Sequence, residues 1–244
     1  MCGRFILLSS ARELVEEFDL EEAPELVPRY NIAPSQEIAA ITASPERGPH
    51  CRELTYLKWG LIPFWAKDPS IAHKLINARA ETLDSKPAFK SSFRKRRILI
   101  PANGFFEWKK TVTGPKQPYL IGREEHVLFA FAGISDEWKN PSGEIVRTCA
   151  IITTDSNDLI KSIHDRMPVI VLKTDYALWL ESKNTDSEDF RKMLESHDIE
   201  NLVITQVSPK VNKPDYDEPD CIEPVENFDS LADLYTQGSL NLTE

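Results

Sequence analysis

The sequence predicts an α+β fold, a single domain built on a curved, barrel-like mixed β-sheet with flanking helices. About nine short β-rich runs outnumber about three segments with helical periodicity. These segments do not alternate regularly, which argues against the parallel sheet of a βαβ protein. The 17 prolines and 9 glycines are scattered singly and divide the chain into short segments, with no internal repeat. Together these observations favour a curved sheet that helices flank.

Apolar residues recur at helical spacing over residues 11–18, 174–182 and 187–196. The first of these ranges follows Ser10, and Ser10 with Glu13 has the spacing of a capping box, in which each side chain bonds the backbone N–H of the other residue. We therefore expect helices over these three ranges.

Residues of high β propensity are concentrated in short runs between polar or turn-forming residues. The expected strands cover residues 37–42, 53–58, 97–100, 105–108, 119–121, 127–134, 145–154, 169–172 and 202–207. The acidic stretch after residue 182 contains an expected helix and an expected strand, so we assign it to the same domain. The sequence thus predicts one domain over residues 1–228 and a C-terminal tail over residues 229–244.

The composition, with 41% hydrophobic and 28% charged residues, is that of a soluble globular protein. No apolar run approaches the roughly 20 residues that span a bilayer, and the first residues lack the layout of a signal peptide. We expect no membrane partner, and a cytoplasmic, nucleoid-associated protein in a bacterium or a nuclear one in a eukaryote.

The four cysteines contain no C-x-x-C pair, and their wide spacing argues against a zinc knuckle or a thioredoxin-like motif. Without a signal peptide we expect free thiols rather than disulfides. Cys149 lies in an apolar run and is expected in the core. We expect neither a metal ion nor another cofactor.

The formal net charge of −10 is unevenly distributed. Residues 181–244 carry a net charge of −11, whereas residues 1–180 carry a net charge of +1. Within this near-neutral part, residues 86–97 hold six Lys and Arg side chains and no acid. Such a run is either a solvated surface loop or part of a nucleic-acid contact, because affinity for phosphates comes mainly from Lys and Arg. The charge of the whole chain therefore does not exclude DNA binding.

Cys2 is the first residue whose own chemistry suggests a function. Removal of Met1 leaves an α-amine and a thiol on the same residue, which is a 1,2-aminothiol. The ordinary pKa is about 7.7–8.0 for the amine and about 8.5 for the thiol, so minor fractions of both are nucleophilic at neutral pH. This pair suits acyl transfer, as in N-terminal nucleophile hydrolases, or closure of a thiazolidine ring on an aldehyde carbon. The alternative is an incidental cysteine near a start site.

Glu107 stands between two aromatic residues in an apolar run. Strand alternation places Phe105, Glu107 and Lys109 on one face, and Phe106 and Trp108 on the other. Burial beside aromatic walls raises the pKa of a carboxyl group and makes it a usable acid or base near neutrality. The alternative is an edge strand with Glu107 in solvent.

His164 is followed by Asp165 and Arg166 at an expected helix-to-strand junction. Histidine is the side chain whose ordinary pKa suits proton transfer at neutral pH. The alternative is a structural histidine that bonds backbone groups. The other histidines lie in polar segments and receive no role.

Trp59 and Trp65 lie a short distance ahead of Asn77, Arg79 and the basic run. Aromatic stacking beside cations is how sequence-tolerant single-strand binders work. Trp59 fits a core position equally well.

Nine motifs occur in order along the chain: MCGRF (1–5), RYNIAP (29–34), WGLIP (59–63), INARAET (76–82), PANGFFEW (101–108), FAGI (131–134), TTD (153–155), HDRMP (164–168) and VSPKVN (207–212). Read together, these segments resemble the SOS-response-associated peptidase (SRAP) family. The resemblance covers roughly residues 2–226, nearly the whole chain.

The resemblance implies the SRAP fold and a sensor that covalently caps abasic sites in single-stranded DNA. Met1 is removed, in an autoproteolytic step or otherwise, and the new N-terminus forms a thiazolidine with the ring-opened sugar. This implies autopeptidase activity and an abasic-site cross-linking or lyase-type activity. A covalent one-to-one mechanism requires only a monomer, and single-stranded DNA containing abasic sites is the implied partner.

The resemblance also assigns roles residue by residue. Cys2 would supply the amine and the thiol, and Asn77 would hold the N-terminus or the sugar. Glu107 would assist formation and reversal of the Schiff base, and His164 would transfer protons during sugar opening. The implied DNA-binding residues are Arg4, Arg79, Lys86 and Arg166 at phosphates, Pro34 and Trp65 against bases, and Thr153.

Two other classes of function remain open. An N-terminal nucleophile amidohydrolase also begins Met-Cys-Gly, but it does not need Glu107 and His164. It also needs a downstream synthase domain for its ammonia, which 244 residues do not accommodate. A non-covalent reader of modified DNA bases would use the same basic surface, but it has no need of an aminothiol at position 2.

Overall fold

The computed structural model of the chain describes residues 2–44, 51–111, 114–180, 188–195, 199 and 201–225. The predicted tail, residues 229–244, lies outside the described residues. So do the last two residues of the helix predicted over 174–182 and both end residues of the helix predicted over 187–196. In the described part of the chain, no helix is long and apolar enough to cross a membrane.

The described elements are mostly short, as the sequence indicates. The strands are β1 (Phe5–Leu7), β2 (Arg29–Ile32), β3 (Glu37–Ala43), β4 (Arg52–Trp59), β5 (Asn77–Arg79), β6 (Arg97–Ala102), β7 (Gly104–Lys109), β8 (Gln117–Arg123), β9 (Phe129–Lys139), β10 (Ile145–Asp155), β11 (Arg166–Pro168), β12 (Ile170–Val171) and β13 (Leu202–Gln206). The α-helices are α1 (Ala11–Phe18), α2 (Pro87–Lys95), α3 (Tyr176–Leu180) and α4 (Glu188–Lys192). The 3₁₀ helices are η1 (Pro69–Lys74), η2 (Ala80–Thr82), η3 (Glu124–His126), η4 (Lys173–Asp175), η5 (Pro209–Asn212) and η6 (Pro219–Cys221).

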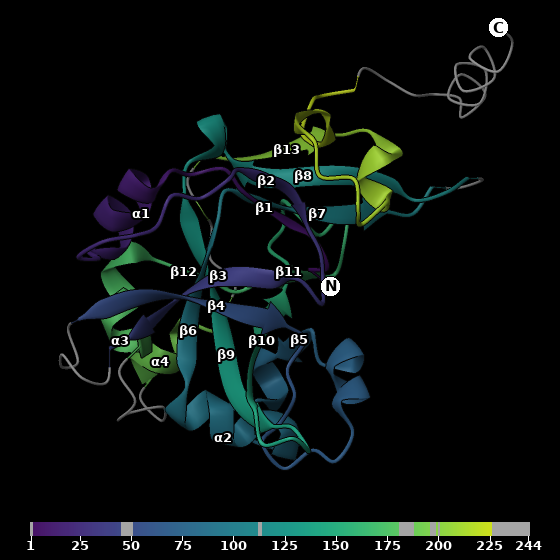
Figure 1. The fold of residues 1–244 in the computed structure, drawn as a ribbon. Coiled ribbons are helices and arrows are strands. Elements are labelled where there is room, and N and C mark those ends of the chain that lie inside the picture. The colour runs from purple at the N-terminus through teal and green to yellow at the C-terminus, as the bar shows by residue number, and fades with distance from the viewer. Residues whose placement is uncertain are drawn as a thin grey trace, which may run out of the picture.

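Two sheets face each other in the fold (Figure 1). One has the strand order β13-β8-β7-β1-β2, and the other has the order β11-β10-β4-β3-β6-β9-β12. In the second sheet β9 and β10 also pair, which closes β10, β4, β3, β6 and β9 into a barrel. The barrel is mixed, because β10 runs parallel to β4 and to the added strand β5 but antiparallel to β9. The predicted α+β fold on a barrel-like mixed sheet is confirmed.

The run of six cations in residues 86–97 is not a solvated loop. Most of it forms α2, which buries Phe89, Ser92 and Phe93 against the barrel. The reason is an apolar stripe at helical spacing, which the surrounding Lys and Arg residues obscure in the sequence. Four of the cations are exposed, namely Lys86, Lys90, Arg94 and Lys95.

Arg97 is the cation of this run that is most clearly structural. Its guanidinium is buried and donates from Nε to Trp179 O at 2.6 Å and from Nη1 to Phe93 O at 2.9 Å. It also lies 4.8 Å from the centre of the Phe190 ring. Burial lowers the pKa of Arg97 to about 10. Arg97 therefore caps the carbonyl ends of α2 and α3 and is unavailable to a phosphate.

The core has two parts, and the side chains of β7 are distributed between them. The larger cluster fills the barrel and includes Phe105 and the predicted core residue Cys149. A smaller cluster, which includes Ile6, Phe106 and Val211, lies between the five-stranded sheet and η5. The predicted alternation along β7 is confirmed, since Phe105 and Phe106 pack on opposite faces.

A buried side chain and a helix cap fix the passage from β1 into α1. The Asn103 side chain accepts from Leu8 N at 2.7 Å and Ser9 N at 3.2 Å, and it donates to Ser9 Oγ at 2.9 Å and His126 O at 2.6 Å. The predicted capping box of Ser10 then starts α1. Asn103 thereby ties the N-terminal strand to the β6–β7 turn.

Replacing Asn103 with alanine should lower the free energy of unfolding by about 3 kcal/mol, because it leaves several buried polar groups without partners. Urea unfolding measures this loss. Asn140→Ala is the matched control, because the Asn140 side chain makes a similar number of hydrogen bonds in a surface turn. It should lower the free energy of unfolding by less than about 1 kcal/mol. Equal losses in the two variants would contradict the anchoring role of Asn103.

Candidate active site

The start of the chain is held inside the molecule by strand pairing. β1 lies between β2 and β7, with Phe5 opposite Phe105. Phe106 N–H donates to Arg4 O at 3.0 Å, so the antiparallel pairing continues toward the N-terminus. This register brings Glu107 to the level of Gly3, next to Cys2.

A hydrogen bond links Cys2 to the other sheet. Asn77, at the start of β5, donates from Nδ2 to Cys2 O at 2.8 Å. Asn77 itself is placed by the parallel pairing of β5 with β10, in which it lies opposite Ile151. The Cys2 side chain is fully buried, and its Sγ lies 3.9 Å from Arg4 O. The structure thus brings the predicted residues Cys2 and Asn77 into direct contact.

Glu107 and His164 face each other near the N-terminus. Glu107 is 2% exposed, and its Oε2 lies 3.9 Å from His164 Nε2. Burial raises the pKa of Glu107 to about 7, and the positive charge of the amino terminus partly offsets this effect. The alternative of a solvent-exposed edge carboxylate is excluded. Both protonation states of Glu107 are therefore populated at neutral pH, as a general acid and base requires.

The surroundings of His164 favour its neutral form. Burial lowers its pKa, and the charge of the amino terminus acts in the same direction. The backbone N–H of Arg166 donates to Nδ1 at 3.0 Å. In the neutral ring the proton is then on Nε2, the nitrogen that faces Glu107. Asp165 Oδ1 also lies 3.0 Å from Nδ1, so it can accept from this nitrogen when the ring is protonated.

The thiol of Cys2 is held in its neutral form. Burial raises its pKa, and the negative charge of Glu107 raises it further. A thiolate is the nucleophilic form of cysteine, so a reaction at Sγ requires a base that removes the proton. Glu107, whose charge acts on this thiol, is a candidate for that base.

Arg166 is enclosed by acceptors at the edge of the site. Its guanidinium pairs with Glu81, with Asp155 Oδ1 at 2.7 Å and with Thr153 O at 2.6 Å. The guanidinium lowers the pKa of Glu81 through their hydrogen bond. The proposed phosphate-binding role of Arg166 stays a prediction, and a phosphate there would have to compete with two carboxylates.

Arg4 is likewise engaged within the protein. Its Nη1 donates to Asn31 Oδ1 at 3.0 Å and to Val211 O at 2.7 Å. Asn31 in turn donates to the carbonyls of Val211, Lys213 and Tyr216. Arg4 therefore fastens the segment around η5 to the N-terminal strand. Its DNA contact also stays a prediction.

The other predicted DNA-binding residues lie on separate segments. Arg79 and Thr153 are opposite each other in the β5–β10 pair. Pro34 lies in the turn between β2 and β3, and Trp65 is 48% exposed in the loop after β4. Lys86 is the exposed N-cap residue of α2. Trp59, in contrast, is fully buried, so the core alternative holds for it.

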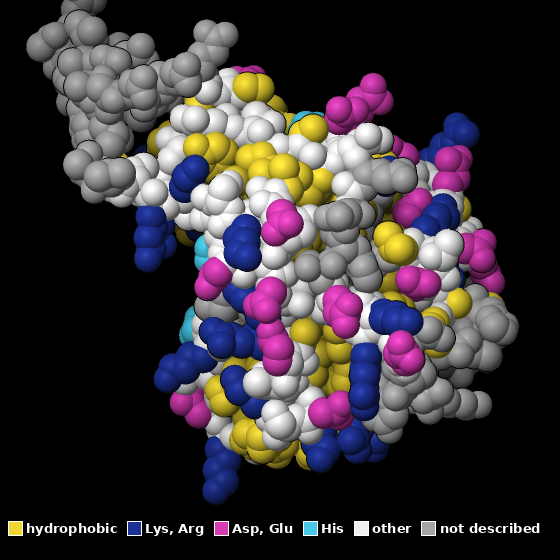
Figure 2. Space-filling view, turned by 180° about the vertical axis from the view of Figure 1, so that it is seen from behind, with side chains coloured by type: hydrophobic (Ala, Val, Ile, Leu, Met, Phe, Trp, Pro, Cys, Tyr) yellow, Lys and Arg dark blue, Asp and Glu magenta, His cyan; other side chains and the backbone are white. Residues whose placement is uncertain are grey.

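Charges of both signs are interspersed on the face that Figure 2 shows. Arg166 has two acidic partners, Glu81 and Asp155. Sequence analysis assigns neither of them a role, although both lie in motifs of the SRAP resemblance. The only sequence feature that could have indicated a role is their position, two residues after Arg79 and two residues after Thr153. In the part of the chain that the structure describes, no group of three or more His, Cys, Asp and Glu side chains is placed to hold a metal ion.

Three buried polar atoms near Cys2 and β10 have no hydrogen-bond partner among the described residues. They are Asn77 Oδ1, Thr153 Oγ1 and Arg166 Nε. Buried polar atoms are normally hydrogen-bonded, so each exception calls for an explanation such as strain or a catalytic role. The three atoms are one acceptor, one hydroxyl and one cationic donor.

Comparison with known proteins agrees with this geometry. Residues 1–214 match the family "SOS response associated peptidase (SRAP)". The chain belongs to the SRAP family. A relative in Bacillus subtilis, the abasic site processing protein YoqW, is 42% identical over 226 residues, which are 91% of this chain and 99% of the relative. The abasic site processing protein HMCES of Xenopus tropicalis is 33% identical over 70% of this chain and 57% of its own length.

Solved structures show the same SRAP fold. A protein of Bacteroides thetaiotaomicron superposes with a TM-score of 0.81 at 26% identity, over 92% of this chain and 100% of that chain. The described geometry of Cys2, Asn77, Glu107 and His164 thus lies within an SRAP domain.

The raised pKa of Glu107 predicts a pH-dependent stability. The folded protein keeps the Glu107 proton up to about pH 7, whereas the unfolded chain loses it near the ordinary value of 4.5. The folded state binds more protons over this window, so the free energy of unfolding decreases as pH rises from 4.5 to about 7.

Glu107→Gln removes this titration, so the variant should gain stability relative to the parent as pH rises through the same window. Urea unfolding of both proteins at several pH values measures the difference. A difference that does not change with pH would show that Glu107 titrates normally.

Proposed function

We propose that the protein forms a covalent adduct with ring-opened abasic sites in single-stranded DNA, through Cys2 after removal of Met1. The observation that carries the proposal is the position of Cys2. Asn77 holds the carbonyl of Cys2, and Glu107 and His164 face each other beside it. The names of its SRAP relatives, which are abasic site processing proteins, support the same substrate.

The proposed chemistry uses both groups of the aminothiol. The α-amine adds to the C1 aldehyde of the open sugar, and loss of one water gives an imine. The thiol then adds to the imine carbon, the new C–S bond closes a five-membered thiazolidine, and the thiol proton passes to the nitrogen. The second step is intramolecular, so its high effective concentration lets it compete with β-elimination and strand breakage.

The acid/base pair has a defined task in each step. Protonated Glu107 can donate to the leaving hydroxyl when the imine forms, and ionised Glu107 can accept the proton from Cys2 Sγ. A carboxyl with a pKa of about 7 serves both tasks at neutral pH. His164, neutral and protonated on Nε2, can exchange protons with Glu107 or with the sugar during ring opening.

The atoms that lack partners fit the proposed substrate. Asn77 Oδ1 and Thr153 Oγ1 can bond sugar hydroxyls once the site opens around the sugar, because both atoms are buried in this structure. An N-terminal nucleophile amidohydrolase has no comparable use for the Glu107–His164 pair, and a non-covalent base reader has none for the aminothiol. A one-to-one adduct also needs no second copy of the chain.

The decisive test is a covalent adduct that survives denaturation. The parent, with loss of Met1 verified by intact mass, should give a heat-stable band with a single-stranded oligonucleotide that carries one abasic site. Cys2→Ser should form an imine that borohydride traps, but no durable band, because a hydroxyl does not replace the thiol in ring closure. Cys149→Ser is the matched control, because Cys149 is a second fully buried cysteine, in the barrel.

A durable band from Cys2→Ser would exclude the thiazolidine, and no band from the processed parent would overturn the proposed function. A duplex carrying the same lesion tests the preference for single strands. Equal rates on both substrates would remove that part of the proposal.

A second prediction separates binding from bond formation. Residues 1–180 carry a net charge of only +1, so non-covalent DNA binding should be modest and should weaken as salt rises. The adduct is held by covalent bonds, so its final yield should change little over the same salt range. Time courses at several salt concentrations measure both quantities. A final yield that falls as steeply as the initial rate would contradict this division.

A further inference from the structure

The loop that follows β4 carries two exposed aromatic side chains. Phe64 is 56% exposed and Trp65 is 48% exposed. The loop begins at Gly60, whose φ is +132° and where a Cβ would lie 3.0 Å from Ala72 O. Only glycine takes this conformation in so narrow a space. We call residues 60–66 the aromatic loop.

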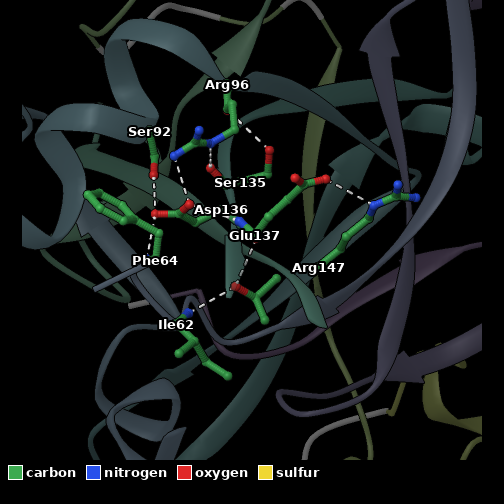
Figure 3. Close-up of polar contacts among 9 residues, drawn as sticks. Ile62, Phe64, Ser92, Arg96, Ser135, Asp136, Glu137 and Arg147 are labelled. Atoms are coloured by element: carbon green, nitrogen blue, oxygen red, sulfur yellow. Dashed lines mark hydrogen bonds and ion pairs between the residues drawn. The ribbon is translucent and has the colours of Figure 1, made fainter. Parts of the chain in front are cut away.

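Side chains from β9 and β10 fix the backbone of the aromatic loop on one side of Trp65. Ile62 N–H donates to Thr148 Oγ1 at 2.9 Å, and Phe64 N–H donates to Asp136 Oδ2 at 3.1 Å. Figure 3 shows Ile62 and Phe64 with these contacts. The loop is therefore held at alternate residues as it approaches Trp65.

A third bond fixes the aromatic loop on the other side of Trp65. Trp138, two residues after Asp136 on β9, donates from Nε1 to Ala66 O at 2.7 Å. Both neighbours of Trp65 are thus bonded to β9, while its own ring is exposed. The ring is presented on a backbone that is fixed before any ligand arrives.

Asp136 also accepts a hydrogen bond from α2, the helix that carries exposed cations. Its carboxylate is 2% exposed and accepts from Ser92 Oγ at 3.2 Å and from Arg96 Nη2 at 2.7 Å (Figure 3). The backbone N–H of Glu137 donates to it at 2.8 Å. One buried carboxylate therefore joins the aromatic loop, α2 and β9, and Arg96 balances its charge.

We infer that Asp136 is a positioning residue for the DNA strand beside the abasic site, an inference that rests on the proposed function. Single-strand binders combine an aromatic surface for bases with cations for phosphates. Asp136 fixes the aromatic loop, which carries Trp65, relative to the exposed cations of α2. A surface fixed in this way loses less conformational entropy on binding than a loop that must be ordered.

The role concerns binding rather than bond formation. The hydrogen bonds of Asp136 go to the aromatic loop, α2 and its own strand, whereas Cys2 is bonded to Asn77 on β5. A change at Asp136 should therefore raise the DNA concentration that half-saturates the reaction, and it should leave the rate at saturating DNA within about twofold of the parent.

The test is a double-mutant cycle between Asp136 and Trp65. The probe for binding is a single-stranded oligonucleotide with a tetrahydrofuran abasic analogue, which has no aldehyde and cannot form the adduct. Asp136→Asn, which keeps the size of the side chain but removes its charge, should weaken binding about threefold to tenfold. In a Trp65→Ala background the same substitution should change binding less than about twofold, because the ring it positions is gone.

Glu137→Gln is the matched control. This carboxylate is the next one on β9 and pairs with Arg147 at 3.1 Å on the surface, away from the aromatic loop. The control should bind DNA as the parent does. Thermal unfolding of every variant shows whether it is folded under the binding conditions.

Trp138→Phe supplies a second route if Asp136→Asn does not fold. It removes the bond to Ala66 without touching Asp136, and it should show the same dependence on Trp65. The inference is overturned if the folded variants bind with parental affinity, or if they weaken binding equally with and without Trp65. A parent that binds no single-stranded DNA would instead overturn the proposed function.

Discussion

The pairing of β10 with its neighbours is the constraint on which the site depends. Thr153 lies opposite Arg79 on one side and opposite Pro168 on the other, so one strand fixes both β5 and β11. β5 presents Asn77, and the turn before β11 presents His164. The hydrogen bond from Asn77 to the Cys2 carbonyl then joins this layer to the five-stranded sheet, where Glu107 lies. The chemistry proposed at Cys2 thus draws on both sheets.

The residues that chemical reasoning from the sequence grouped around Cys2 lie close together in the structure, whereas the contacts of Arg166 were not foreseen. Cys2, Glu107 and His164 are unusual because of their immediate neighbours, and those neighbours are visible in the sequence. Contacts between distant residues are not visible. Arg166 pairs with Glu81, 85 positions away, and this pairing depends on β10 lying between their segments.

The strands were predicted well where several residues show the pattern. β1, β2 and β5 are too short for alternation to appear, and tertiary pairing alone defines them. The helix α2 was missed because Phe89 and Phe93 form a narrow apolar stripe among six cations. Similarly, nothing in the sequence separates Arg97, which is buried, from Arg94, which is exposed. Packing against α3 and α4 makes that difference.

The long-range pairing of β1 with β7 has a consequence for the newly synthesised protein. Cys2 leaves the ribosome early, but its acid/base partners Glu107 and His164 follow only after a further 105 and 162 residues. Folds dominated by such distant contacts form late, after most of the chain is available. Under the proposed function, a nascent or misfolded chain therefore carries an ordinary, unassisted cysteine, and the reactive nucleophile exists only in molecules that have completed their fold.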